Sequence, residues 1–141
     1  MRLFKYGIFI LYILLFTKGA TAFHPDIYKP RVPKELLEAV QEIENPYEPT
    51  PEIVEAGRKI YFGKGLCVTC HSNNGKGVRL PGHSPRNFTD KEWQTVRSDG
   101  ELMWILKNGS PGTGMPKRVG QVISEEEGWY VIHFIRTFNE K

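Results

Sequence analysis

The chain has only two cysteines, and both lie in the pentapeptide CVTCH at positions 67–71. A redox-active dithiol would need a preceding strand and a βαβ pattern, and the sequence shows neither. A zinc site would need a second ligand pair at finger-like spacing, which His83 alone does not supply. A structural disulfide between Cys67 and Cys70 would close too short a loop to stabilise much, because the entropic gain grows with loop size.

The fourth interpretation of CVTCH is covalent attachment of haem. Two thiols spaced three residues apart on a helical turn can reach the two vinyl groups of one porphyrin as thioethers. The adjacent imidazole then lies under the iron as an axial ligand. Cys-x-x-Cys-His is the signature of this arrangement. We therefore predict one haem c, attached through Cys67 and Cys70, with His71 as the proximal iron ligand.

The segment GSPGTGMP at 109–116 offers the other axial ligand, Met115. It follows His71 by 44 residues, which is enough chain to cross from one haem face to the other. Gly112 and Gly114 would let the backbone approach the porphyrin closely, and Pro116 would stiffen the far side. We predict Met115 as the distal ligand, with an open sixth position as an alternative.

Other methionines and histidines of the chain are candidates for the same position. Met103 lies inside a predicted helix, where methionine usually fills the core. His24 lies in a proline-rich stretch, and His133 lies on the last predicted helix, where packing or solvent contact is the commoner role. His83, in PGHSP close to CVTCH, is the serious rival of Met115.

The elements that position these residues are helices. Thr50 and Pro51 begin a helix that runs to about Phe62, and a shorter helix is expected at 34–44 between prolines. Two capping boxes, Ser98 with Glu101 and Ser124 with Glu127, begin helices that end near residues 108 and 138. No run alternates with period two. The fold class is therefore all-α, with three to four helices and two long loops of about 35 and 15 residues that a haem would organise.

The pattern of the N-terminal residues is typical of a secretory signal peptide. Arg2 and Lys5 precede an apolar run at 6–16, and ATA follows at 20–22. Eleven apolar residues fall short of the roughly 20 that a spanning helix needs. We expect cleavage after Ala22 and a periplasmic or otherwise extracytoplasmic protein without a membrane span, the alternative being an uncleaved anchor. The expected division is 1–22 signal peptide, 23–49 proline-rich extension and 50–141 haem domain.

Charge is unevenly distributed along the chain. The formal charge of +3 becomes zero once the three positive charges of the signal are removed. Residues 23–56 then carry three basic and eight acidic side chains, and residues 57–141 carry thirteen basic and eight acidic ones. A neutral total argues against nucleic acid as a partner, whereas the basic part could steer a protein partner.

With CVTCH and GTGMP together, residues 50–138 resemble a class I monohaem c-type cytochrome of the small bacterial type. The resemblance implies a small cytochrome c fold in which the first and last helices cross, and Gly57 with Tyr61 and the segment 131–138 with Phe134 match that crossing. It also implies a proline whose carbonyl binds the axial imidazole N–H. Pro81 and Pro85 both qualify, and we favour Pro81.

These features predict an electron carrier rather than an enzyme. A haem with His and Met on opposite faces has no open position for substrate, and the methionine raises the potential. Redox partner proteins would meet the haem edge among basic side chains drawn from Lys64, Lys76, Arg79, Lys117 and Arg118. Three alternatives stay open: a haem subunit fixed in a larger oxidoreductase, a small peroxidase or gas-binding haem protein, and a non-haem thiol oxidoreductase.

Overall fold

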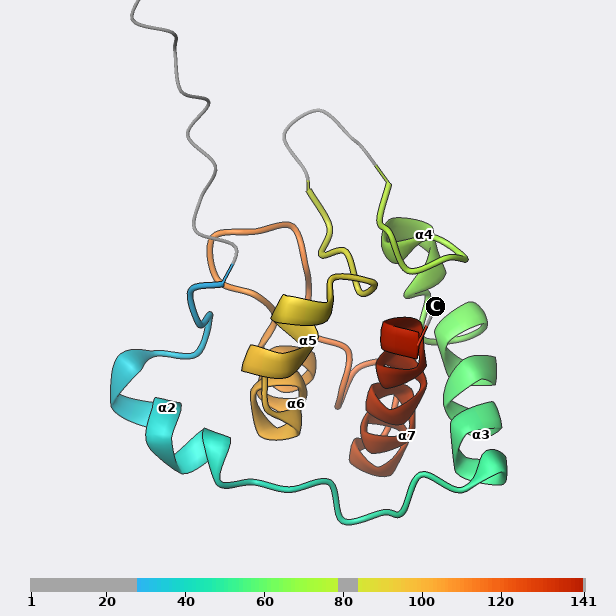
Figure 1. Cartoon of the computed structure of the whole chain (residues 1–141), viewed down its shortest axis with the longest axis horizontal. Helices are drawn as coiled ribbons and strands as arrows, with labels where there is room; N and C mark the ends of the chain where they lie inside the picture. The colour runs from blue at the N-terminus through green and yellow to red at the C-terminus, as the bar shows by residue number, and fades with distance from the viewer. Residues whose placement is uncertain (1–27, 79–83, 141) are drawn as a thin grey trace, which may run out of the picture.

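Helices make up the regular structure of residues 28–78 and 84–140, the part of the chain that the computed structural model describes. In chain order they are α2 (Lys34–Gln41), α3 (Pro51–Phe62), α4 (Val68–His71), α5 (Lys91–Val96), α6 (Asp99–Asn108), α7 (Glu125–Arg136) and a 3-10 helix (Thr137–Glu140) (Figure 1). Apart from one isolated bridge between Val119 and Ile123, these residues form no β-structure. The prediction of an all-α fold is confirmed.

The three longest helices carry the start signals that the sequence shows. The Thr50 hydroxyl accepts a hydrogen bond from the Ile53 N–H at 3.4 Å, and Pro51 is the first residue of α3. Both capping boxes are formed, at the start of α6 and of α7. These caps satisfy N–H groups that have no partner inside the helix, which is why the helices begin where predicted.

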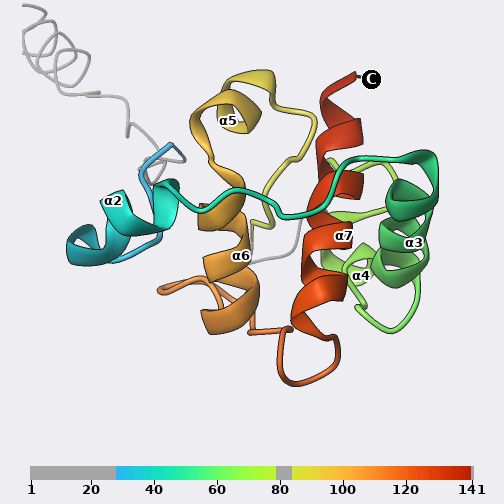
Figure 2. The same cartoon turned by 90° about the horizontal axis from the view of Figure 1, so that it is seen from below.

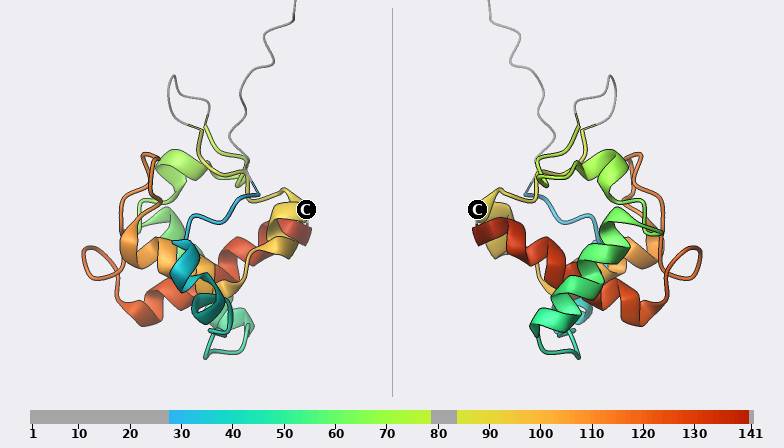
Figure 3. Two further views of the ribbon diagram at one scale, coloured as in Figure 1. Left: turned by 90° about the vertical axis from the view of Figure 1, so that its left-hand side faces the viewer. Right: turned by 90° about the vertical axis from the view of Figure 1, so that its right-hand side faces the viewer.

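Helix α7 lies between α6 and α3, and α2 packs on the outer side of α6 (Figure 2). The contact between α3 and α7 is the most extensive of the fold, and the two helices cross (Figure 3, right). Gly57 lies at the closest approach, since a Cβ built on it would be 2.0 Å from the Tyr130 carbonyl oxygen. Beside it, the rings of Tyr61 and Phe134 meet edge to face at 5.2 Å. The predicted crossing of the first and last helices of the haem domain is confirmed.

Two short helices, α4 and α5, occupy the stretch after α3 that the sequence pattern leaves as a loop of about 35 residues. Asp90 caps the start of α5, and its carboxylate accepts a hydrogen bond from the Trp93 N–H at 3.1 Å. A helix of six residues is too short for its apolar positions to show a period, and only its cap could have indicated it. The helix count of three to four is therefore too low, because six α-helices occur in the described residues.

Residues 28–50, which we call the strap, lie against the rest of the fold. The strap runs from α2 past α6 and α7 to the start of α3 (Figure 2). The Asn45 side chain donates to the Trp129 carbonyl at 3.1 Å, and the Tyr47 carbonyl lies 2.6 Å from Nε2 of His133. Near its start, the Tyr28 carbonyl accepts a hydrogen bond from Arg97. These bonds fix both ends of the strap.

Helix α2 ends at Gln41, three residues before the predicted end at Glu44. Its end packs against the first turn of α6. A Cβ on Gly100 would lie 2.0 Å from the Val40 carbonyl oxygen and 2.9 Å from that of Ile43. Because Gly100 has no side chain, both carbonyls fit against it where the chain turns away from the helical path.

The N-terminal predictions fall on residues 1–27, outside the described residues. This applies to the signal peptide at 1–22, to its cleavage after Ala22 and to His24. Within residues 28–78 and 84–140, no helix combines the length and the hydropathy that crossing a membrane requires.

Replacing Gly57 with alanine tests the crossing of α3 and α7. The added methyl group would meet the Tyr130 carbonyl, so the two helices must separate, and we expect a loss of about 2 kcal/mol in the free energy of unfolding. Lys59→Ala on the exposed side of the same helix is the control and should change stability by less than about 0.5 kcal/mol. Denaturant unfolding followed by circular dichroism measures both. A Gly57→Ala variant as stable as the wild type would contradict the close packing.

Candidate haem site

The CVTCH segment forms one helical turn held in a constrained position. Cys67 precedes α4, and the His71 N–H donates to the Cys67 carbonyl at 2.9 Å. Leu66 and Ser72 bracket the turn in left-handed conformations, with φ of 53° and 64°. Such conformations cost free energy in residues other than glycine and persist only where neighbours enforce them. Here the Tyr61 hydroxyl donates to the Ser72 carbonyl at 2.7 Å and ties the end of the turn to α3.

Both thiols are free, and their surroundings differ. Cys67 is buried beside the hydrophobic core, whereas Cys70 is exposed. Burial raises the pKa of the Cys67 thiol to about 11, so the group is protonated at neutral pH. A reactive thiol works as its thiolate, and burial opposes that form at Cys67. In the described residues, no three His, Cys, Asp or Glu side chains gather as metal ligands, so the zinc interpretation gains no support there.

The His71 ring is held by a hydrogen bond on one nitrogen. The ring is buried, and Nδ1 lies 3.1 Å from the Arg86 carbonyl oxygen. A carbonyl can only accept, so Nδ1 carries the proton, and in a neutral ring Nε2 then has its lone pair available. Burial lowers the pKa of His71, with the bond to Arg86 acting in the opposite direction, and the lowered pKa favours the neutral ring. A neutral imidazole with a fixed tautomer is the form that binds iron.

The carbonyl that meets His71 comes from Arg86. The resemblance to cytochromes implies a carbonyl of Pro81 or Pro85, with Pro81 favoured, and the structure places the carbonyl of Arg86, the residue after Pro85, at Nδ1 of His71. Pro81 and the rival ligand His83 lie outside the described residues, so their roles stay predictions. Every residue carries a carbonyl, and no sequence signal distinguishes Arg86 for this contact.

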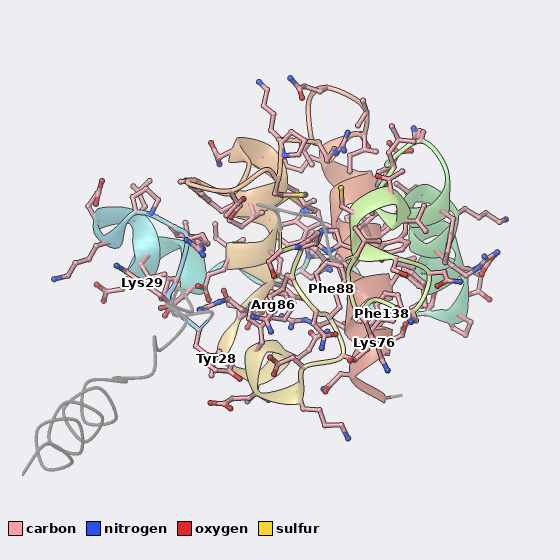
Figure 4. The ribbon with its side chains drawn as sticks, turned by 90° about the horizontal axis from the view of Figure 1, so that it is seen from above. Tyr28, Lys29, Lys76, Arg86, Phe88 and Phe138 are labelled. Carbon is pink, nitrogen blue, oxygen red and sulfur yellow. The ribbon has the colours of Figure 1, made fainter. Side chains whose placement is uncertain are left out.

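Phe88 is a second neighbour of His71 that the sequence did not indicate. The two rings are stacked, with centroids 4.2 Å apart and planes 15° from parallel. The Phe88 N–H donates to the Gly75 carbonyl at 2.7 Å, which joins the loop after α4 to the loop before α5. In Figure 4, Phe88 lies between Arg86 and Phe138. The aromatic ring limits how far the imidazole can turn.

Met115 lies on a loop whose backbone is fixed on both sides. The Met115 N–H donates to the Thr113 hydroxyl at 3.2 Å, and its carbonyl accepts from the Ser110 N–H at 3.0 Å. The side chain is half-buried and packs against the hydrophobic core that includes Cys67. Gly112 adopts a φ of +73°, so this turn requires a glycine for its conformation as well. The thioether and the CVTCH turn thus border the same core.

The other ligand candidates in the described residues have ordinary packing roles. Met103 is 3% exposed, and its methyl end lies close to Gly128 at the start of α7, as expected for a residue that fills the core. His133 is buried, and its Nε2 is engaged by the Tyr47 carbonyl. Both assignments from sequence, core filler and satisfied packing residue, agree with these contacts.

The donor chemistry of the site fits a covalently bound haem. Two free thiols flank one turn, and the imidazole at its end is neutral, with one nitrogen held and the other available. A half-buried thioether borders the same core. The left-handed residues on both sides of α4 add the local constraint expected where a chain must present side chains to a ligand.

Comparison with known protein families identifies the family of the domain that carries this site. The model of the family "Cytochrome C oxidase, cbb3-type, subunit III" matches residues 52–135, which is more than half of the chain. No curated protein and no solved structure matches. Domains of this family carry haem c, with iron, bound covalently and typically once per domain, and they transfer electrons through it. The chain therefore belongs to the cbb3-type subunit III family of cytochrome c domains, as a monohaem c-type cytochrome with an all-α fold.

Proposed function

We propose that the protein is an exported electron carrier that moves single electrons between redox proteins. In this proposal Cys67 and Cys70 form the thioethers to haem c, His71 is the proximal iron ligand, and Met115 is the distal one. When bound, the haem supplies a one-electron couple at its iron. The chain holds the haem in place, keeps water from it and presents one edge to a partner.

The observation that carries the proposal is the state of His71. Its Nδ1–H is held by the Arg86 carbonyl, and Phe88 stacks on the ring, so Nε2 is the nitrogen left to bind iron. The thiols of Cys67 and Cys70 lie on the turn directly before it, one buried and one exposed. This is the set of groups that covalent attachment and axial ligation need, on one short helix.

Met115 is the better-supported distal ligand among the described residues. Met103 and His133 are already engaged in the core, while the Met115 thioether is half-buried on a loop with a fixed backbone. Sulfur binds iron weakly, so the loop must hold the ligand in position without help from a strong bond. The two backbone bonds of Met115 would do this, and a methionine ligand would raise the reduction potential relative to a second histidine.

We propose that redox partners meet a basic surface of the haem domain. Lys76 and Lys117 are exposed, whereas Lys64 forms an ion pair with Glu127 at 2.6 Å. Arg79, another of the expected residues, lies outside the described residues. Weak contacts steered by charge suit a carrier that must leave its partner quickly.

The location belongs to the same proposal. Cytochrome c domains of this family are typically extracytoplasmic. A signal peptide at 1–22, cleaved after Ala22, would deliver the extension at 23–49 and the haem domain at 50–141 to the periplasm. The basic start, short apolar run and ATA ending support it.

Removing either thiol tests haem attachment. Cys67→Ala and Cys70→Ala should each give much less stable holoprotein, because a domain of this size depends on the macrocycle to complete its core. Haem staining on a denaturing gel measures the covalent haem. Thr69→Ala, between the two cysteines, is the control and should keep a full signal. A wild-type protein without covalent haem would instead establish the thiol oxidoreductase alternative.

Removing the thioether tests the distal ligand. Met115→Ala should keep covalent haem but lose the sulfur-to-iron charge-transfer band and have a lower reduction potential. Met103→Leu, a replacement of similar volume in the core, should keep the band. An unchanged spectrum in Met115→Ala would rule Met115 out. Ready binding of carbon monoxide by the ferrous wild type would favour the peroxidase or gas-binding alternative, because it requires an open or easily displaced sixth position.

A second candidate is a haem subunit fixed in a larger oxidoreductase. The family takes its description from a subunit of a cbb3-type cytochrome c oxidase, which favours this candidate. The strap would offer the surface for such a contact, because its inner side is bonded to α6 and α7 while Leu36 and Ile43 remain 45% and 46% exposed.

Size-exclusion chromatography of native extract separates the two candidates. A free carrier should elute at the mass of a small monomer, with its haem absorbance in that fraction. A subunit should elute with a much larger assembly and keep constant proportions to other polypeptides through a second column. Haem absorbance only in the monomer fraction, at low and at physiological salt, would exclude the subunit candidate.

A further inference from the structure

Asp90 uses its two carboxylate oxygens for different contacts. Oδ1 accepts the Trp93 N–H at 3.1 Å and caps α5. Oδ2 forms an ion pair with Arg86 and also accepts from the Tyr28 hydroxyl of the strap at 3.5 Å. A cap needs only one oxygen acceptor, so Oδ2 is left for the contacts with Arg86 and Tyr28.

Arg86 is held at both its side chain and its backbone. Its guanidinium pairs with Asp90, lies 5.2 Å from the centre of the Trp93 ring, and donates from Nε to the Asn87 carbonyl at 3.3 Å. Both side chains of the pair are largely buried, 19% and 18% exposed, so solvent screens their attraction only in part. The carbonyl of the same residue is the one that faces Nδ1 of His71.

The chain between Arg86 and Asp90 is a closed turn. The Asn87 side-chain oxygen accepts from the Thr89 N–H at 3.0 Å and from its hydroxyl at 2.9 Å. The Phe88 N–H is bonded to Gly75, and the Phe88 ring stacks on His71. With the turn closed, the orientation of the Arg86 peptide is coupled to the position of its guanidinium.

We propose that Asp90 is a positioning residue for the axial histidine: through its ion pair with Arg86 it aims the Arg86 carbonyl at Nδ1–H of His71 and thereby tunes the reduction potential. The inference rests on the proposed function, in which His71 binds the haem iron. In Figure 4, Arg86 lies between Tyr28 and Phe88, which is the path from the strap to the imidazole.

The expected direction follows from the chemistry of the imidazole. A strong N–H···O=C bond makes the ring a more basic ligand, and a more basic ligand favours the ferric over the ferrous state. A carbonyl that is less well aimed would weaken this bond and raise the potential. Tyr28 of the strap lies 3.5 Å from the same carboxylate oxygen, a contact much longer than the ion pair, so the positioning is assigned to Arg86.

The experiment uses purified ferric holoprotein with isotope-labelled histidine. Nuclear magnetic resonance gives the solvent exchange rate of the axial Nδ1–H, identified by its hyperfine shift, and electrochemistry gives the potential. Asp90→Asn keeps an oxygen to cap α5 but removes the charge. Arg86→Gln removes the other half of the pair and changes the net charge in the opposite direction, so a charge effect alone cannot produce the same result in both.

Asp99→Asn is the matched control. Asp99 pairs with Arg136 at 2.6 Å, with side chains 23% and 27% exposed, and the other bonds of Arg136 go to Gln94 and Arg97. The substitution therefore removes the same charge from a similar ion pair that makes no direct contact with the turn at 86–90. Its link to the turn runs through Gln94, whose Nε2 donates to the Phe88 carbonyl at 2.8 Å. It reports the effect of charge and of a lost pair while the contact between Asp90 and Arg86 stays intact.

We expect Nδ1–H exchange to be roughly tenfold faster in both Asp90→Asn and Arg86→Gln than in Asp99→Asn. A change of this size is what the loss of a hydrogen bond to a charged group produces. The potential of Asp90→Asn should rise more than that of Asp99→Asn. Exchange at the control rate in either variant would overturn the positioning role. If the wild type shows no histidine-ligated low-spin haem, the proposed function fails with it; a normal spectrum with unmoved exchange defeats the positioning role alone.

Discussion

The contact between α3 and α7 is the constraint on which the rest of the structure depends. Helix backbones rarely approach so closely, and here it is possible because Gly57 presents no side chain to the Tyr130 carbonyl. The approach brings the Tyr61 ring against those of Phe134 and Phe138, with centroids 5.2 and 5.7 Å apart. It also sets where the Tyr61 hydroxyl can reach the Ser72 carbonyl, and so where the CVTCH turn ends. The close packing at Gly57 is therefore linked, through Tyr61, to the end of the CVTCH turn that carries His71.

A buried ion pair at the start of α6 connects this helix to the strap. Arg97 and Glu101 are 8% and 2% exposed and lie 3.0 Å apart. Taking two charges out of water is costly unless their remaining hydrogen-bonding groups are satisfied. Here Glu101 also accepts from the Ser98 N–H and from Gln41 of the strap, and Arg97 donates to the Tyr28 carbonyl. The pair thus stabilises the fold together with the strap, since without the strap two of these bonds would be lost.

Much of the helical framework could be predicted from the sequence, because caps and breakers act locally. A helix start is indicated at Thr50, Ser98 and Ser124 by capping signals that lie within four residues, and each of the three is the N-cap of a helix in the structure. The parts that could not be predicted depend on contacts between distant residues. The Arg86 carbonyl and the Phe88 ring reach His71 only after the loop has folded back, and the end of α2 packs against Gly100, far along the chain. In the candidate site, the pattern CVTCH identifies the two thiols and the imidazole. The tautomer of His71 follows from the Arg86 carbonyl oxygen, a backbone atom that no sequence pattern indicates.

The strap has a consequence for the order in which the chain assembles. Its bonds join residues separated by 69, 60, 84 and 86 positions, from Tyr28 to Arg97, Gln41 to Glu101, Asn45 to Trp129 and Tyr47 to His133. Contacts over such separations form late, because the entropy of closing the long intervening chain must be overcome before the contact can stabilise the structure. The start of the strap must wait for Arg97 and Glu101, and its end at Asn45 and Tyr47 must wait until α7, near the end of the chain, has been made and packed. The strap precedes α3 in the sequence, but its end takes its final position only after α7 does.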